Sequence, residues 1–227
     1  MKGFRGGVRA ALPVVLGYLG IGLAAGVVER AAGLSHAEIL LLSTVLYAGS
    51  AQFVLAGLLA LGAAPAAIVS TVFLVNLRHL LLSAALAPAL RGLPAWKNAL
   101  IGLQLTDETF VVAAGRRPLS AAWMAGLNLS AWAAWAAANV AGAALSGLAA
   151  DTRALGFALP SMFAALLVLQ LRLQRRLRPA LAVAAVAAAL GVGAQLALAG
   201  PWAVVLATVL GATVGLALQR WTSAPSS

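Results

Sequence analysis

The sequence contains no cysteine and few charged residues, with 15 basic and 5 acidic side chains among 227. The lack of cysteine excludes a disulfide framework and a thiolate metal site. Soluble domains carry about 25% charged residues, so a chain with 9% cannot cover a soluble surface. Hydrophobic residues make up 63% of the chain, and 23 glycines add to the apolar share. The composition excludes a soluble enzyme, a nucleic-acid-binding domain and a disordered protein, and predicts an integral membrane protein.

Several motifs with defined chemistry are also missing. The chain has no G-x-x-x-x-G-K-[ST] loop, so it cannot cradle ATP phosphates itself. It lacks H-E-x-x-H and G-x-S-x-G, which metalloproteases and serine hydrolases need. Its two histidines, His36 and His79, lie far apart in the sequence. We therefore expect no metal, no cofactor, no enzymatic activity and no nucleic-acid partner.

Eight apolar stretches predict an all-α fold of transmembrane helices, because a crossing needs about 20 residues. Seven helices are the alternative if one stretch is re-entrant, and 119–149 is either one long tilted helix or a broken pair. We expect a single integral membrane domain over residues 1–227, with a first half at 1–118, a second half at 119–221 and a polar tail at 222–227. The predicted spans are 10–28, 37–61, 66–88, 95–114, 119–149, 155–171, 179–199 and 202–218.

The basic residues predict which side of the membrane the loops occupy, because cytoplasmic loops are enriched in Lys and Arg. With eight crossings, the N-terminus, the Arg116–Arg117 turn, the arginine-rich loop at 172–178 and Arg220 fall on one side. Both termini are therefore expected in the cytoplasm. The loop that holds Arg91 and Lys97 is the exception and falls outside.

Two weaker patterns concern helix packing and a possible internal repeat. Gly22 and Gly26 stand in GxxxG spacing, which lets another helix approach closely, although glycine is common throughout this chain. The stretches 37–114 and 154–218 have similar lengths and suggest an internal repeat, as in many transporters. The alternative is that the uniform Ala- and Leu-rich composition produces the same similarity without a true repeat.

Ionisable residues at membrane depth are concentrated in two places. One is Asn76-Leu77-Arg78-His79 in the third predicted span, and the other is Thr106-Asp107-Glu108 in the fourth. A charge near a helix centre costs about 2.5–3.5 kcal/mol on insertion scales. We therefore expect an ion pair between Arg78 and Asp107 or Glu108. The alternatives are a packing ion pair without a role in transport, or an Arg78 that snorkels at the interface.

The second predicted span also carries polar residues. Ser43, Tyr47 and Ser50 follow the i, i+4, i+7 spacing of one helical face. Gly49 is a position where a transmembrane helix can break and present its backbone to a ligand. The alternative is that these residues only hydrogen-bond between helices. A further stripe, expected to serve packing, consists of Asn128, Trp132, Trp135 and Asn139.

Together these motifs resemble the AzlC family, the large subunit of bacterial branched-chain amino acid exporters. The matching segments are Pro13 with 17–26, LYAGSAQF at 46–53, NLRHLLLSAAL at 76–86, TDETF at 106–110 and LPSMFAALL after Gly156. The resemblance implies a proton-driven exporter of leucine, isoleucine and valine, with methionine as a further candidate. It also implies a multi-pass protein of the bacterial cytoplasmic (inner) membrane with a small membrane partner of the AzlD type.

The resemblance places the functional region in these motifs. Within this region we expect substrate binding by Tyr47, Ser50, Gln52, Asn76, Arg78, Thr106 and Asp107, and proton coupling by Glu108, Asp107 and His79. A zwitterionic substrate needs a cation for its carboxylate, which the Arg78 guanidinium offers. An acidic side chain suits its ammonium group. The alternative functions are the permease subunit of an ATP-driven transporter, a channel-like protein for another small solute, or a membrane scaffold.

Overall fold

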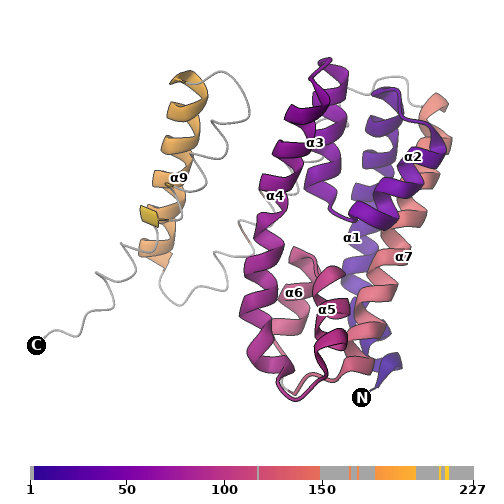
Figure 1. The fold of residues 1–227 in the computed structure, drawn as a ribbon, viewed down its shortest axis with the longest axis vertical. Coiled ribbons are helices and arrows are strands. Elements are labelled where there is room, and N and C mark those ends of the chain that lie inside the picture. Colours follow the sequence, from indigo (N-terminus) through magenta and orange to yellow (C-terminus); the bar gives the residue numbers. More distant parts are fainter. Residues whose placement is uncertain are drawn as a thin grey trace, which may run out of the picture. The chain divides into compact units, whose positions relative to one another are not determined.

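The computed structural model of this chain describes residues 3–116, 118–148 and 177–197, together with positions 164, 168, 210, 213 and 214. Every element in these described ranges is helical (Figure 1), which confirms the predicted all-α class.

The chain divides into two compact units, Met1–Leu159 and Pro160–Ser227. The second unit contains α9 (Leu177–Ala197), which covers most of the span predicted at 179–199. The spans predicted at 155–171 and 202–218, and with them most of the second copy of the predicted repeat, lie outside the described residues. The predicted site residues, from Tyr47 to Glu108, all belong to the first unit.

Two long helices, α1 (Phe4–Ala31) and α7 (Ala121–Leu145), run parallel to each other through the first unit. Gly7, near the start of α1, packs on the first two turns of α7. Gly26, near the end of α1, packs on the backbone of α7 at Asn139. The pair is therefore in contact over most of its length and forms the frame on which the shorter helices pack.

The predicted close approach of a helix at Gly22 and Gly26 is confirmed. A Cβ atom at Gly26 would lie 1.9 Å from the carbonyl oxygen of Asn139, and one at Gly22 would lie 2.7 Å from the Cβ of Ala138. Such distances leave room only for a residue without a side chain. The partner helix is α7, so the segment predicted at 119–149 forms one long helix and not a broken pair.

The apolar stretch predicted as one span at 37–61 is divided into two helical arms. The first arm is α2 (His36–Leu41) with a π-helical turn, η1 (Leu42–Leu46), and the second is α3 (Gly49–Ala60). Between them Tyr47 adopts a left-handed backbone conformation with φ of 44°. This conformation is uncommon for a residue with a side chain, and it ends the first arm.

The chain turns back between these two arms instead of continuing in a straight line. The side-chain amide nitrogen of Gln52 lies 3.3 Å from the hydroxyl of Ser43, nine residues earlier. A straight helix would place these residues about 13.5 Å apart along its axis. Figure 1 accordingly shows α2 and α3 in the same half of the first unit. The expected break near Gly49 is confirmed, but the segment does not cross once. It folds back, so α2, η1 and α3 form a first helical hairpin.

A second helical hairpin enters from the opposite end. The stretch predicted as one span at 95–114 forms α5 (Ala95–Leu103) and α6 (Asp107–Ala114). Leu90, before this stretch, and Leu119, after it, belong to the same buried cluster, which includes residues from the early turns of α1 and α7. The stretch therefore enters and leaves at one end, in the half of the unit opposite to α2 and α3 (Figure 1).

The two hairpins are connected by a full-length helix, α4 (Pro65–Leu86), which a 3-10 turn, η2 (Ala87–Leu90), extends. Among the described residues, Leu12–Ala31 and Pro65–Leu90 are long and apolar enough to cross a membrane. With 12 and 8 residues, α3 and α6 measure about 18 and 12 Å, against a hydrocarbon core of about 30 Å. Each hairpin therefore reaches about halfway along α4.

Because both hairpins fold back, basic residues from three parts of the chain gather at one end of the first unit. Arg116 lies over the ring of Trp123, in the first turn of α7, at 4.9 Å from its centroid. Arg91 and Lys97 flank the turn between η2 and α5, which packs beside the same end of α7. The loop with Arg91 and Lys97, predicted on the opposite side, therefore lies at the same end as Arg5.

Candidate functional site

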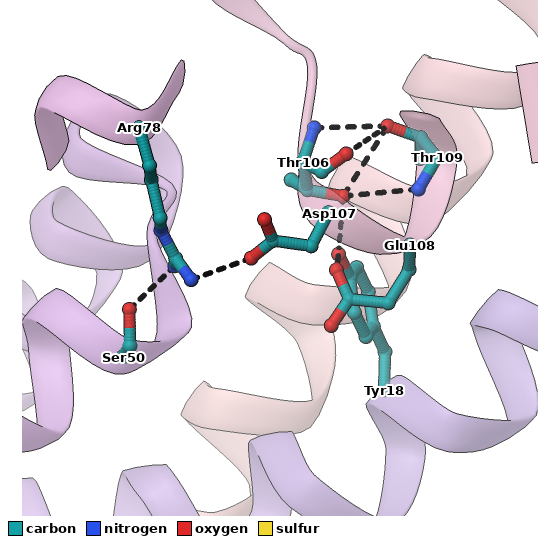
Figure 2. Close-up of polar contacts among 7 residues, drawn as sticks. All are labelled: Tyr18, Ser50, Arg78, Thr106, Asp107, Glu108 and Thr109. Atoms are coloured by element: carbon teal, nitrogen blue, oxygen red, sulfur yellow. Dashed lines mark hydrogen bonds and ion pairs between the residues drawn. The ribbon is translucent and has the colours of Figure 1, made fainter. Parts of the chain in front are cut away.

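The two hairpins meet at Arg78, which lies at the centre of the apolar span Pro65–Leu90. Its Nη1 forms an ion pair with Asp107 Oδ2 at 2.6 Å, and its Nη2 donates to Ser50 Oγ at 2.5 Å (Figure 2). Asp107 is the first residue of α6 and Ser50 the second residue of α3. The predicted ion pair is confirmed, and Arg78 reaches into the protein at mid-helix instead of snorkelling to the interface.

The Arg78–Asp107 pair is reachable from outside the protein. The two side chains are 28% and 26% exposed, respectively, whereas Ser50 is buried. A charged pair that is partly open at membrane depth differs from a fully packed structural ion pair.

The start of α6 is held by a network of hydroxyl groups. Thr106 Oγ1 accepts from the backbone N–H of Thr109, and Thr109 Oγ1 accepts from the backbone N–H of Thr106, so each residue caps the other. The hydroxyl of Tyr18 lies 2.7 Å from Thr106 Oγ1 and 2.8 Å from Glu108 Oε2 (Figure 2). These bonds fix the helix turn that presents Asp107 to Arg78.

Sequence reasoning did not single out Tyr18 as a functional residue. Its signal was weak, because a lone tyrosine in the first apolar span is ordinary. The only hint was its place in the 17–26 segment that carries the family resemblance.

A second polar cluster surrounds Gln52, in the first turn of α3, and includes residues of α1 and α7. Gln52 is fully buried, and its Nε2 donates to Glu29 Oε1 at 2.8 Å and lies 3.4 Å from Asn139 Oδ1. Trp135 Nε1 donates to Gln52 Oε1 at 2.7 Å. Gln52 therefore belongs to a buried network and does not contact Arg78.

The remaining predicted site residues lie near these clusters with fewer contacts. The buried hydroxyl of Tyr47 and the buried Oδ1 of Asn76 have no hydrogen-bond partner among the described residues. His79 follows Arg78 on α4 and is partly buried. The expected shared face of Ser43, Tyr47 and Ser50 does not form, because the break at Tyr47 turns the chain.

The stripe predicted on the fifth segment makes polar contacts in addition to packing. Trp132 Nε1 donates to the carbonyl of Thr44, beside the end of the first arm, at 3.0 Å. Asn128 Nδ2 donates to the carbonyl of Ile101 in α5 at 3.3 Å. Through these two hydrogen bonds α7 holds both hairpins in place. Among the described residues no group of three or more His, Asp or Glu side chains is arranged to hold a metal ion.

Comparison with known proteins identifies the family. The family described as AzlC protein matches residues 13–149, which include both hairpins and every predicted site residue. The chain belongs to the AzlC family. It is 32% identical to the inner membrane protein YgaZ of Escherichia coli K12 over 98% of this chain and 93% of that protein. It is also 33% identical to an uncharacterized membrane protein of Archaeoglobus fulgidus, over 74% of this chain and 76% of that protein.

No solved structure matches this chain. The family match and the membrane relatives make this AzlC chain a helical membrane protein of a transport-related family. The resemblance found in its motifs is thereby confirmed.

Proposed function

We propose that this AzlC protein exports branched-chain amino acids from the cytoplasm, driven by the proton gradient. The substrates would be leucine, isoleucine and valine, with methionine as a further one. The observation that carries the proposal is the Arg78–Asp107 ion pair at the point where the two hairpins meet, halfway along a membrane-spanning helix. A small AzlD-type membrane subunit would complete the transporter.

The two charges of this pair match the two charges of an amino acid. A substrate carboxylate can replace Asp107 on the Arg78 guanidinium, which is planar and binds carboxylates with two parallel hydrogen bonds. The substrate ammonium group then pairs with the Asp107 carboxylate. No charge is left unpaired at membrane depth before or after the exchange, so the substrate binds without the cost of an isolated buried charge.

The α3 helix adds to the preference for a carboxylate. Its N-terminus begins beside Ser50 and has no side-chain cap, and the N-terminal end of a helix carries a partial positive charge. Half-helices with N-termini directed at a substrate carboxylate are a recurring device in transporters. The apolar side chain of the substrate would be recognised by packing alone, and packing discriminates one methylene by only about 1–3 kcal/mol. Broad specificity among these amino acids follows.

The basic end of the first unit supports an orientation. We propose that this end, with Arg5, Arg91 and Arg116, faces the cytoplasm, because cytoplasmic loops are rich in Lys and Arg. Helices α1, α4 and α7 with the three spans predicted at 155–171, 179–199 and 202–218 would give six crossings. This count keeps both termini in the cytoplasm, within one membrane domain.

Transport in proteoliposomes tests the proposed function. The chain is reconstituted alone and with its AzlD-type partner, loaded with labelled leucine, and placed under an imposed pH gradient. We expect leucine movement that depends on the gradient and stops when a protonophore is added. Movement that requires ATP and ignores the gradient, or no movement of leucine, valine or methionine in either preparation, would contradict the proposal.

A further inference from the structure

Glu29 is a fully buried carboxylate in α1, with an exposure of 0%. Its Oε1 accepts a hydrogen bond from Gln52 Nε2 at 2.8 Å. Its Oε2 is buried and has no hydrogen-bond partner among the described residues. Glu29 is absent from the predicted site, because a single acidic residue near the end of an apolar run is also typical of a helix that is about to leave the membrane.

The groups that face Glu29 from the neighbouring elements are neutral. They are Gln52 from α3, with Ser43 from η1 and Asn139 from α7 bonded to the same amide. Neither α3 nor α7 contains a charged residue. The following residue, Arg30, donates to the carbonyl of Leu34. On α2, Glu38 is exposed and bonded to Ser35, and His36 is exposed at its start. No cation among the described residues forms an ion pair with Glu29.

The orientation of the Gln52 amide follows from its partners. Trp135 Nε1 can only donate, so the Gln52 atom that it meets at 2.7 Å must be the carbonyl oxygen. The NH2 group of Gln52 therefore points at Glu29. Asn139 Nδ2 donates to the carbonyl of Trp135 at 2.8 Å, which leaves its Oδ1 facing the same NH2 group. This arrangement gives a carboxylate one hydrogen bond, but the neutral amide cannot neutralise its charge.

We propose that Glu29 carries the coupling proton of this transporter: its carboxyl holds a proton on Oε2 and releases it in exchange for substrate. An unpaired buried charge costs far more free energy than a neutral carboxyl group in the same place, so the buried arrangement of Glu29 fits the protonated form. The motif-based prediction assigned the proton to Asp107, Glu108 or His79. Asp107, however, is paired with Arg78, and Glu108 lies in hydrogen-bonding distance of Tyr18. The inference rests on the proposed export function.

The position of Glu29 suits an antiported proton. It lies at the end of α1 opposite to Arg5, Arg91 and Arg116, which is the outer side in the proposed orientation. Trp135 connects it to the substrate site, since its indole contacts both Gln52 and, edge to face at 5.1 Å between centroids, Tyr18. A proton that enters from outside at Glu29 therefore changes a network that extends to the residues beside Arg78. On release, the proton leaves to the cytoplasm and the carboxylate keeps its bond from Gln52.

Two measurements test the proposal with two variants. E29Q mimics a permanently protonated Glu29, and the control E38Q removes an exposed carboxylate on the next helix. The first measurement, on the reconstituted complex, compares leucine counterflow at equal pH with leucine movement driven by a pH gradient. We expect E29Q to keep counterflow and lose the response to the gradient, while E38Q keeps both. Gradient-driven transport by E29Q equal to that of E38Q would overturn the proposal, and so would loss of counterflow and gradient response together.

The second measurement does not depend on transport. Infrared spectroscopy of the purified protein should show the carbonyl band of a protonated carboxyl group that is missing in E29Q and present in E38Q. If E29Q is not recovered folded, Glu29→Asp replaces it and should shift the band. Absence of the band from the wild-type protein would overturn the proposal. If the wild-type complex moves no amino acid, the proposed function fails, and the band alone decides whether Glu29 holds a proton.

Discussion

Trp135 donates its indole N–H to Gln52 Oε1 at 2.7 Å, and the same ring meets Tyr18 edge to face. One side chain of α7 therefore belongs to both polar clusters, one around Glu29 and the other around Glu108. The ring also fills the space above Gly49, where α3 begins. The starts of the two half-helices are thus positioned by a residue outside the hairpins.

Trp135→Phe should weaken this connection and the fold. The phenyl ring keeps part of the packing, but the buried Gln52 oxygen loses its donor, which costs about 1–3 kcal/mol. We expect a lower unfolding midpoint for the purified protein in detergent. Trp96→Phe, at a 61% exposed position, is the control and should leave the midpoint unchanged. Equal midpoints for the two variants would show that the indole N–H has no stabilising role.

Gly26→Ala should separate α1 from α7. The added Cβ would lie 1.9 Å from the Asn139 carbonyl oxygen, and backbone atoms of a packed helix cannot move aside without loss of the neighbouring contacts. We expect a destabilisation of about 1–3 kcal/mol or more, seen as a smaller folded fraction by size-exclusion chromatography. Gly20→Ala is the matched control in the same helix, since a Cβ there meets nothing within 4 Å. A folded fraction for Gly26→Ala equal to that control would contradict the parallel α1–α7 contact.

Arg78→Lys should impair transport although the positive charge remains. Lysine lacks the planar fork, and one charge-assisted hydrogen bond contributes about 1.5–3 kcal/mol. The leucine concentration at half-maximal transport should therefore rise roughly tenfold to a hundredfold. Arg91→Lys, at an exposed position, should transport like the wild type. If Arg78→Lys reaches half-maximal transport at the same leucine concentration as the wild type, Arg78 does not bind the substrate carboxylate.

Thr106→Ala should loosen the first turn of α6. The substitution removes the cap on the Thr109 N–H and the partner of the Tyr18 hydroxyl, and loss of an N-cap costs about 0.5–2 kcal/mol. We expect a lower unfolding midpoint and slower leucine transport, because Asp107 is the next residue. Thr106→Ser keeps the hydroxyl and should restore most of both properties. If Ser and Ala behave alike, the hydroxyl network does not position Asp107.

The sequence was sufficient to predict the helical class, the close approach at Gly22 and Gly26, and an ion pair between Arg78 and either Asp107 or Glu108, of which the structure has Asp107. Each follows from a strong local constraint. Charges at membrane depth need a partner, and small residues at GxxxG spacing permit close contact. The helix break near Gly49 was also predictable from its small neighbours.

The direction of the hairpins was not predictable from hydropathy. The stretches 37–61 and 95–114 have the length and composition of ordinary crossings, and hydropathy does not record whether a chain continues or turns back. The burial of Glu29 was hidden for a related reason. Its hydrogen-bond partner Gln52 lies 23 residues away, and only the fold of α3 back toward the end of α1 brings the two together.

Competition with leucine analogues shows whether the Arg78–Asp107 pair binds a zwitterion. Isocaproate keeps the carboxylate and the branched chain of leucine but lacks the ammonium group, and isoamylamine keeps the ammonium group but lacks the carboxylate. Counterflow of labelled leucine in proteoliposomes is measured with an excess of each. We expect strong inhibition by unlabelled leucine, isoleucine and valine and little by either analogue. Inhibition by both analogues as strong as that by leucine would contradict it, because the site would then recognise the apolar chain without the two charges.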